Sequence, residues 1–112
     1  MIKILFFSFF ASAAWKAEVV PPRSPVLTGF HEIEIRLQGE DLSHLKGAEV
    51  TLEGNMAHPG MVPVYGKAVP IAPGRFKGRL EFTMKGDWRI TAHIRFANGE
   101  TLEQSIDLLG VK

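Results

Sequence analysis

Apolar and polar residues alternate along most of this chain, and this alternation restricts its fold more than any other feature. From Trp88 to Phe96, every second residue is apolar and the residues between are polar or charged. A strand places successive side chains on opposite faces, so such a run predicts a strand with one buried face. Similar runs recur at 31–38, 48–53, 76–82 and 102–108.

Glycine and proline separate these runs, with 11 glycines and 7 prolines in the chain. Asn98-Gly99 is a hairpin signal, because both residues tolerate positive φ. Further strands are expected near 18–20 and 62–71, which brings the total to about seven. Short strands at regular spacing, with Trp88 on a central one, predict an all-β, immunoglobulin-like antiparallel β-sandwich forming one domain.

The first thirteen residues have the composition of a secretion signal. Lys3 gives a positive start, residues 4–10 form a short apolar core, and Ala11-Ser12-Ala13 gives a small-x-small cleavage pattern. The apolar stretch is too short to cross a hydrocarbon core about 30 Å thick. We expect a signal peptide at 1–13 and a β-sandwich domain at 16–112, periplasmic or secreted, and membrane-associated if the signal stays uncleaved. A buried N-terminal strand is the alternative.

Charge and cysteine content exclude several classes of function. The formal net charge is +1 and no basic stripe stands out, which argues against binding nucleic acid or anionic lipid through a polybasic patch. The chain has no cysteine, so thiolate metal sites, c-type haem attachment and thiol redox chemistry are excluded.

The segment 55–63 is the place where the chain could carry chemistry. Met56, His58 and Met61 form an M-x-H-x-x-M array in an expected loop between two strands. Thioether sulfur is soft and imidazole is borderline, so together they suit Cu(I). Met84 or His31 could add a ligand if the fold brings either one near.

Two other interpretations of this loop stay open. Methionine often fills gaps in a core, in which case Met56 and Met61 are structural. Alternatively the loop and the residues after it, 62–65, form an apolar contact patch for a partner protein, with no metal involved.

Several short motifs occur in an order that resembles one family. They are Gly47-Ala48-Glu49-Val50, the methionine loop at 56–61, Pro73-Gly74-Arg75-Phe76 and Met84-Lys85-Gly86-Asp87-Trp88. In this order they resemble the YtkA-like family, which is related to FixH proteins, over essentially the whole chain after the signal. The resemblance implies an exported immunoglobulin-like domain acting in copper handling or haem-copper oxidase assembly. The implied partner is an acceptor such as an oxidase subunit or another copper chaperone.

No catalytic site is expected. Ser24, Ser43 and Ser105 lack the surroundings of a nucleophile, and Glu40-Asp41 shows no sign of burial. In the alternation, His93 faces outward and is expected to be solvated. Unless it binds metal, Met84 is expected to pack inward with Trp88.

Overall fold

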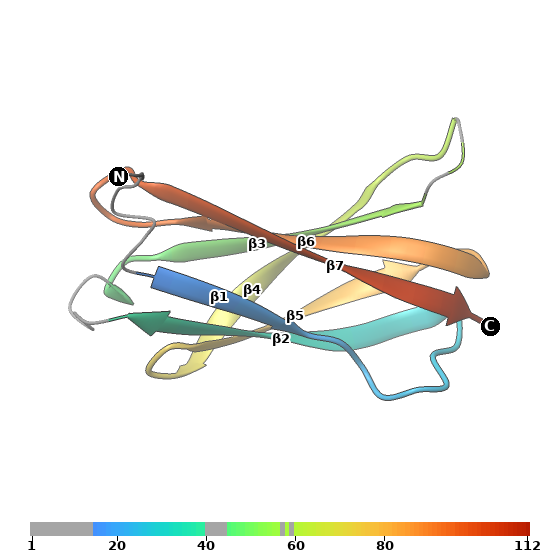
Figure 1. The fold of residues 1–112 in the computed structure, drawn as a ribbon, viewed down its shortest axis with the longest axis horizontal. Helices are drawn as coiled ribbons and strands as arrows, with labels where there is room; N and C mark the ends of the chain where they lie inside the picture. Colours follow the sequence, from blue (N-terminus) through green and yellow to red (C-terminus); the bar gives the residue numbers. More distant parts are fainter. Residues whose placement is uncertain (1–14, 40–44, 57, 59) are drawn as a thin grey trace, which may run out of the picture.

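The structure, a computed structural model, describes residues 15–39, 45–56, 58 and 60–112. Its elements are seven strands: β1 (Trp15–Val20), β2 (Gly29–Gly39), β3 (Glu49–Met56), β4 (Val64–Ala72), β5 (Arg75–Phe82), β6 (Gly86–Arg95) and β7 (Thr101–Val111). All their pairings are antiparallel (Figure 1). The predicted all-β fold of about seven strands is therefore confirmed. The expected signal peptide at 1–13 lies outside the described residues.

The strands form two layers that one strand joins. Their order is β1-β2-β5-β4-β3-β6-β7. β1, β2 and β5 form one layer and β3, β6 and β7 the other, while β4 crosses between them (Figure 1). Constant-type immunoglobulin domains have the same order, with strands A-B-E-D in one sheet and C-F-G in the other. The immunoglobulin-like prediction is confirmed by this order.

β4 changes partner part-way along its length. Residues 64–68 pair with β3, whereas residues 68–72 pair with β5. Beyond Ala68, no described strand pairs with the edge of β4 that faces away from β5. Pro70 lies on this stretch, and the register shifts between Pro70 and Ala72.

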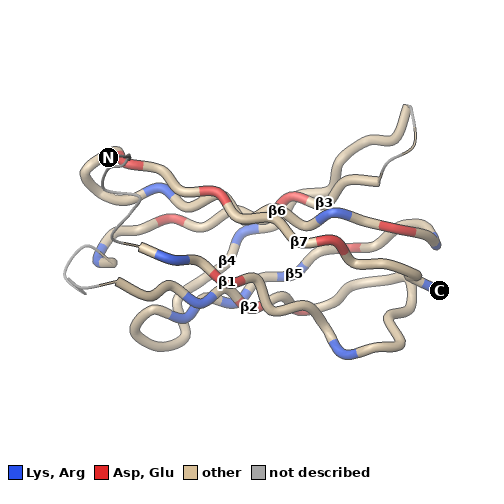
Figure 2. Tube along the Cα trace, viewed as in Figure 1, with Lys and Arg blue, Asp and Glu red and all other residues tan. Residues whose placement is uncertain are grey.

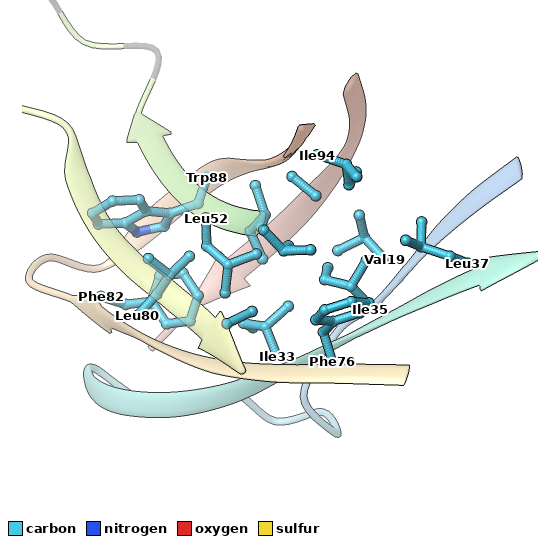
Figure 3. Close-up of a cluster of buried hydrophobic side chains, with 14 of the residues drawn as sticks. Val19, Ile33, Ile35, Leu37, Leu52, Phe76, Leu80, Phe82, Trp88 and Ile94 are labelled. Carbon is cyan, nitrogen blue, oxygen red and sulfur yellow. The ribbon is translucent and has the colours of Figure 1, made fainter. Parts of the chain in front are cut away.

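Both layers turn their apolar side chains toward one core (Figure 3). The largest fully buried side chains are Ile33, Ile35, Leu52, Leu80, Phe82, Ile90 and Ile94. Trp88 is buried among them, with its ring in edge-to-face contact with Phe82 at 5.3 Å between centroids. No charged or polar side chain is buried in the part of the chain that the structure describes. The alternation thus predicted which face of β2, β3, β5, β6 and β7 turns toward the core.

Trp15 is a core residue that the sequence did not single out. It begins β1 and is buried, with its ring 5.4 Å from that of Phe96. Trp15 follows an apolar stretch of sequence and is the first residue of a short strand, so no alternation of apolar and polar residues marks it.

Lys112 forms two backbone hydrogen bonds with the segment between β1 and β2. Thr28 N–H donates to the carbonyl of Lys112, and Lys112 N–H donates to that of Val26. This end of the molecule also carries the described part of the β3–β4 connection (58 and 60–63), the β5–β6 turn (83–85) and the β1–β2 segment (21–28), and we call it the hairpin end (Figure 1). Among the described residues, no helix is long and apolar enough to span a membrane.

Candidate metal centre

Met56 is the last residue of β3, at the hairpin end. It lies opposite Trp88 in the β3–β6 pairing and turns inward, so that it is buried at the margin of the core. Its Cε lies over Gly86: a Cβ built on that glycine would be 2.9 Å from it. The sequence predicted Met56 in a loop, whereas the strand extends to include it.

A tight turn follows, and it joins the other two predicted ligands. Met61 N–H donates to the carbonyl of His58 at 3.3 Å, with Gly60 at a φ of 81° between them. A turn of this kind brings its first and fourth residues together. The His58 side chain is exposed, and the Met61 side chain is half-buried against the margin of the core.

Met84 and His31 lie at the same end of the molecule on other segments. Met84 lies in the β5–β6 turn, and its carbonyl accepts a hydrogen bond from Trp88 Nε1 at 2.9 Å. The Met84 side chain is exposed, so the expectation that it packs inward with Trp88 is wrong. The Trp88 indole thus binds the Met84 backbone carbonyl, while the Met84 side chain is exposed to solvent.

His31 has one ring nitrogen already engaged. Its Nε2 lies 2.6 Å from the carbonyl oxygen of Leu27. A carbonyl can only accept, so Nε2 carries the hydrogen and Nδ1 is left as the nitrogen that could bind a metal. The ring also lies 5.7 Å from that of Phe82, at the rim of the core as the sequence predicted.

An open hollow of about 410 Å³ adjoins Met56. It is lined by Asn55, Met56, Asp87, Trp88, Arg89, Asp107 and Leu109. Arg89 Nε donates to Asp107 Oδ1 at 2.9 Å, and Asp87 Oδ1 accepts from Gly110 N–H at 2.9 Å. Met56 therefore borders solvent-accessible space even though little of its surface is exposed.

All five predicted ligands thus lie on segments at the hairpin end. Within the described residues, no three histidine, aspartate or glutamate side chains are arranged to hold a metal ion. Any metal centre at this end would depend on the methionines.

Comparison with known protein families supports the resemblance. The sequence profile of the YtkA-like family matches residues 11–93, from before β1 into β6. The chain belongs to the YtkA-like family. No curated protein matches this YtkA-like domain. A structure of murine CRIg is similar at a TM-score of 0.46 and 8% identity, covering 88% of this chain and 96% of the murine one.

The YtkA-like domain also contains a cluster that the sequence did not reveal. His93 lies between two carboxylates, with Nε2 2.7 Å from Glu53 Oε1 and Nδ1 3.0 Å from Glu103 Oε2. Its side chain is 36% exposed, so the expectation of a solvated histidine is only partly met. The three residues belong to β3, β6 and β7, and only the register across all three strands could have brought them together.

The electrostatics of this cluster follow from its hydrogen bonds. Partial burial of the ring lowers the pKa of His93, but the hydrogen bonds to Glu53 and Glu103 outweigh it, and the pKa lies above its ordinary value. Hydrogen bonds from Asn55 and His93 hold the pKa of Glu53 below its ordinary value. Asn55 Nδ2 donates to Glu53 Oε2 at 2.7 Å, which connects the cluster to the hollow beside Met56.

Proposed function

We propose that this YtkA-like domain is an exported copper accessory protein that binds Cu(I) through Met56, His58 and Met61. The observation that carries the proposal is the turn between His58 and Met61, directly after Met56 at the end of β3. The sequence already places two soft thioethers and one imidazole within six residues, and the turn brings His58 and Met61 together.

The chemistry of this donor set favours Cu(I) over harder ions. Cu(I) accepts few ligands and prefers thioether sulfur, whereas magnesium and calcium prefer oxygen. A neutral donor set holds the ion without strong charge attraction, which suits delivery of the metal to an acceptor. The acceptor in this proposal is a haem-copper oxidase subunit or another copper chaperone.

Partial burial of the methionines sets a condition on binding. Met56 lies at the margin of the core and Met61 is half-buried, while His58 is exposed. Because Met56 borders the open hollow, a rotation of its flexible side chain would expose the sulfur without opening the core.

The test is an anaerobic titration of the full chain with Cu(I) in competition with a chromophoric Cu(I) chelator. The variant combines Met56→Leu, His58→Ala and Met61→Leu, since leucine keeps the volume of methionine without its sulfur. Wild type should remove copper from the chelator and the triple variant should not. If both compete equally poorly, the site does not exist.

Matched controls separate the three ligands from other histidines and methionines. Met84→Leu and His31→Gln each remove one neighbouring donor from the same end, and His93→Gln removes a histidine from β6, away from the hairpin end. Copper retention should be unchanged in His93→Gln. Weaker retention in Met84→Leu or His31→Gln would add that residue to the ligand set.

A second candidate function is a metal-free interaction module that uses the same loop. It is favoured by Val62 and Tyr65, which are 78% and 65% exposed next to the methionines. Capture of a partner that is insensitive to chelators and to His58→Ala would support this function over copper binding.

A further inference from the structure

Exposed apolar side chains are distributed unevenly over the molecule. Among the described residues, the large hydrophobic side chains that remain exposed are Leu27, Phe30, Val62, Tyr65, Val69, Ile71, Met84 and Leu109. All but Val69 and Ile71 lie in or next to the segments of the hairpin end. Scattered single residues are normal on a protein surface, but a concentration at one end marks a contact surface.

These side chains come from separate segments. Leu27 and Phe30 belong to the β1–β2 segment and the start of β2, Met84 to the β5–β6 turn, and Leu109 to the end of β7. Val62 belongs to the described part of the β3–β4 connection, which rises above the two layers at the upper right of Figure 1. The apolar groups are therefore presented on several turns and strand ends at once.

Cationic side chains are placed among them. Arg23, Lys85 and Lys112 are exposed at this end, where Figure 2 shows blue segments. None of the three forms an ion pair with any residue that the structure describes. The guanidinium of Arg79 lies 4.6 Å from the centre of the exposed Phe30 ring.

The acidic groups near these cations offset them only in part. Asp87 is next to the turn and keeps its negative charge while its carboxylate accepts the Gly110 N–H. Asp107 is paired with Arg89, and Glu81 lies opposite Phe30 in the β2–β5 pairing. The exposed Arg23, Lys85 and Lys112 outnumber Asp87 and Glu81 at this end, and because the three cations are far apart in the sequence they form no basic stripe there.

We propose that the hairpin end docks on the surface of a lipid bilayer that contains anionic lipids. The apolar side chains enter the interfacial region, and the cations stay at the level of the negatively charged headgroups. A bilayer accommodates apolar groups spread over several segments, whereas the centre of a protein interface needs them packed together. This inference does not depend on the copper proposal.

Because the chain has no cysteine, one introduced cysteine can carry an environment-sensitive fluorophore at a chosen position. The full chain is labelled at Leu27→Cys or Leu109→Cys, with Val69→Cys as the matched control. Leu27 and Val69 are 57% and 59% exposed, but Val69 lies on the outer face of β4, away from the hairpin end. All three proteins share the same N-terminal segment, so its contribution is constant.

Each protein is mixed with vesicles of phosphatidylcholine containing a third phosphatidylglycerol, and with vesicles of phosphatidylcholine alone. We expect emission at positions 27 and 109 to shift to shorter wavelength with the anionic vesicles, while position 69 keeps its aqueous spectrum. In the Leu109→Cys background, Arg23→Gln and Lys85→Gln should each weaken vesicle binding about fivefold.

Three results would overturn the proposal. In the first, positions 27 and 109 keep an aqueous spectrum with anionic vesicles. In the second, position 69 shifts as much as they do, which would mean contact without a preferred end. In the third, the shift appears without vesicles as protein concentration rises, which would assign this surface to contact between copies of the chain.

Discussion

Each layer of the sandwich carries carboxylates held by cations on its outer face, but the cations differ. On the β2–β5 face, Glu34 is bound by Arg36 at 2.9 Å and by Arg75 at 2.9 and 3.2 Å. On the β3–β6–β7 face, Glu53 and Glu103 are bound by His93. Arginine stays charged throughout the biological pH range, whereas histidine loses its charge close to neutrality.

The two clusters therefore respond to pH in opposite directions. The hydrogen bonds from Arg75 and Arg36 lower the pKa of Glu34 to about 2, so this cluster is lost only in acid. Protonated His93 can donate to both carboxylates, but neutral His93 can donate to only one. The layer whose hydrogen bonds change near neutral pH also carries Asn55 and Met56, which line the hollow beside the candidate centre.

The largest expected effect tests whether the two layers are one folding unit. Ile33 and Leu52 are both fully buried, one on β2 and the other on β3. Ile33→Ala and Leu52→Ala should each lower the free energy of unfolding by about 2–5 kcal/mol, because each leaves a cavity in the shared core. Urea denaturation should show a single transition for both variants. Two transitions in either would mean that the layers unfold separately.

The next effect concerns the strand that joins the layers. Gly66 lies on β4, and a Cβ there would collide with the backbone carbonyl oxygen of Arg79. Gly66→Ala should lower the free energy of unfolding by about 1–3 kcal/mol, because no side-chain rotation relieves a clash with backbone. Lys67→Ala, next to it on the exposed face, should stay within about 0.5 kcal/mol of wild type in the same urea series. Equal stability of wild type and Gly66→Ala would show that β4 and β5 can move apart at this position with little loss of free energy.

A smaller effect tests the histidine cluster. The pKa of His93 is raised in the folded protein, so its stabilising contribution is complete below pH 6.5 and is lost as pH rises through the folded pKa. His93→Gln should be less stable than wild type by less than about 1 kcal/mol just below pH 6.5, and the difference should shrink as pH rises. Urea series at several pH values give the difference, and NMR titration of the ring gives the pKa. A pKa at or below 6.5 would contradict the assignment.

The smallest effect at neutral pH belongs to Glu34. Its pKa is lowered, so its contribution is present above pH 4.5 and is lost as pH falls toward about 2. Glu34→Gln should be slightly less stable than wild type at neutral pH, and the difference should vanish only below pH 2. Thermal melts across this range compare the two proteins, and a gap that persists in strong acid would mean that Glu34 contributes through packing.

The strands could be predicted because alternation is local. Each strand has one buried face, so the residues that face the core are visible in the sequence around Ile35, Leu52 or Ile90. Trp15 was not identified, because one large residue at the start of a short strand gives no period. Met84 was misplaced, because the sequence does not tell whether a residue next to a turn faces the core or the solvent.

The candidate centre could be predicted by residue type but not by arrangement. Met56, His58 and Met61 are close in sequence, so their proximity was expected. That Met56 turns into the margin of the core depends on how far β3 extends, which pairing with β6 decides. The Glu53–His93–Glu103 cluster was beyond local reasoning, since its members are brought together only by register across β3, β6 and β7.

The unpaired stretch of β4 bears on how this protein behaves at high concentration. A free strand edge beside exposed Val69 and Ile71 would be a template for intermolecular sheet growth. Pro70 has no N–H to offer an incoming strand, and the irregular register after it distorts the edge. Pro70 therefore limits intermolecular strand pairing at the place where β4 passes from one layer to the other.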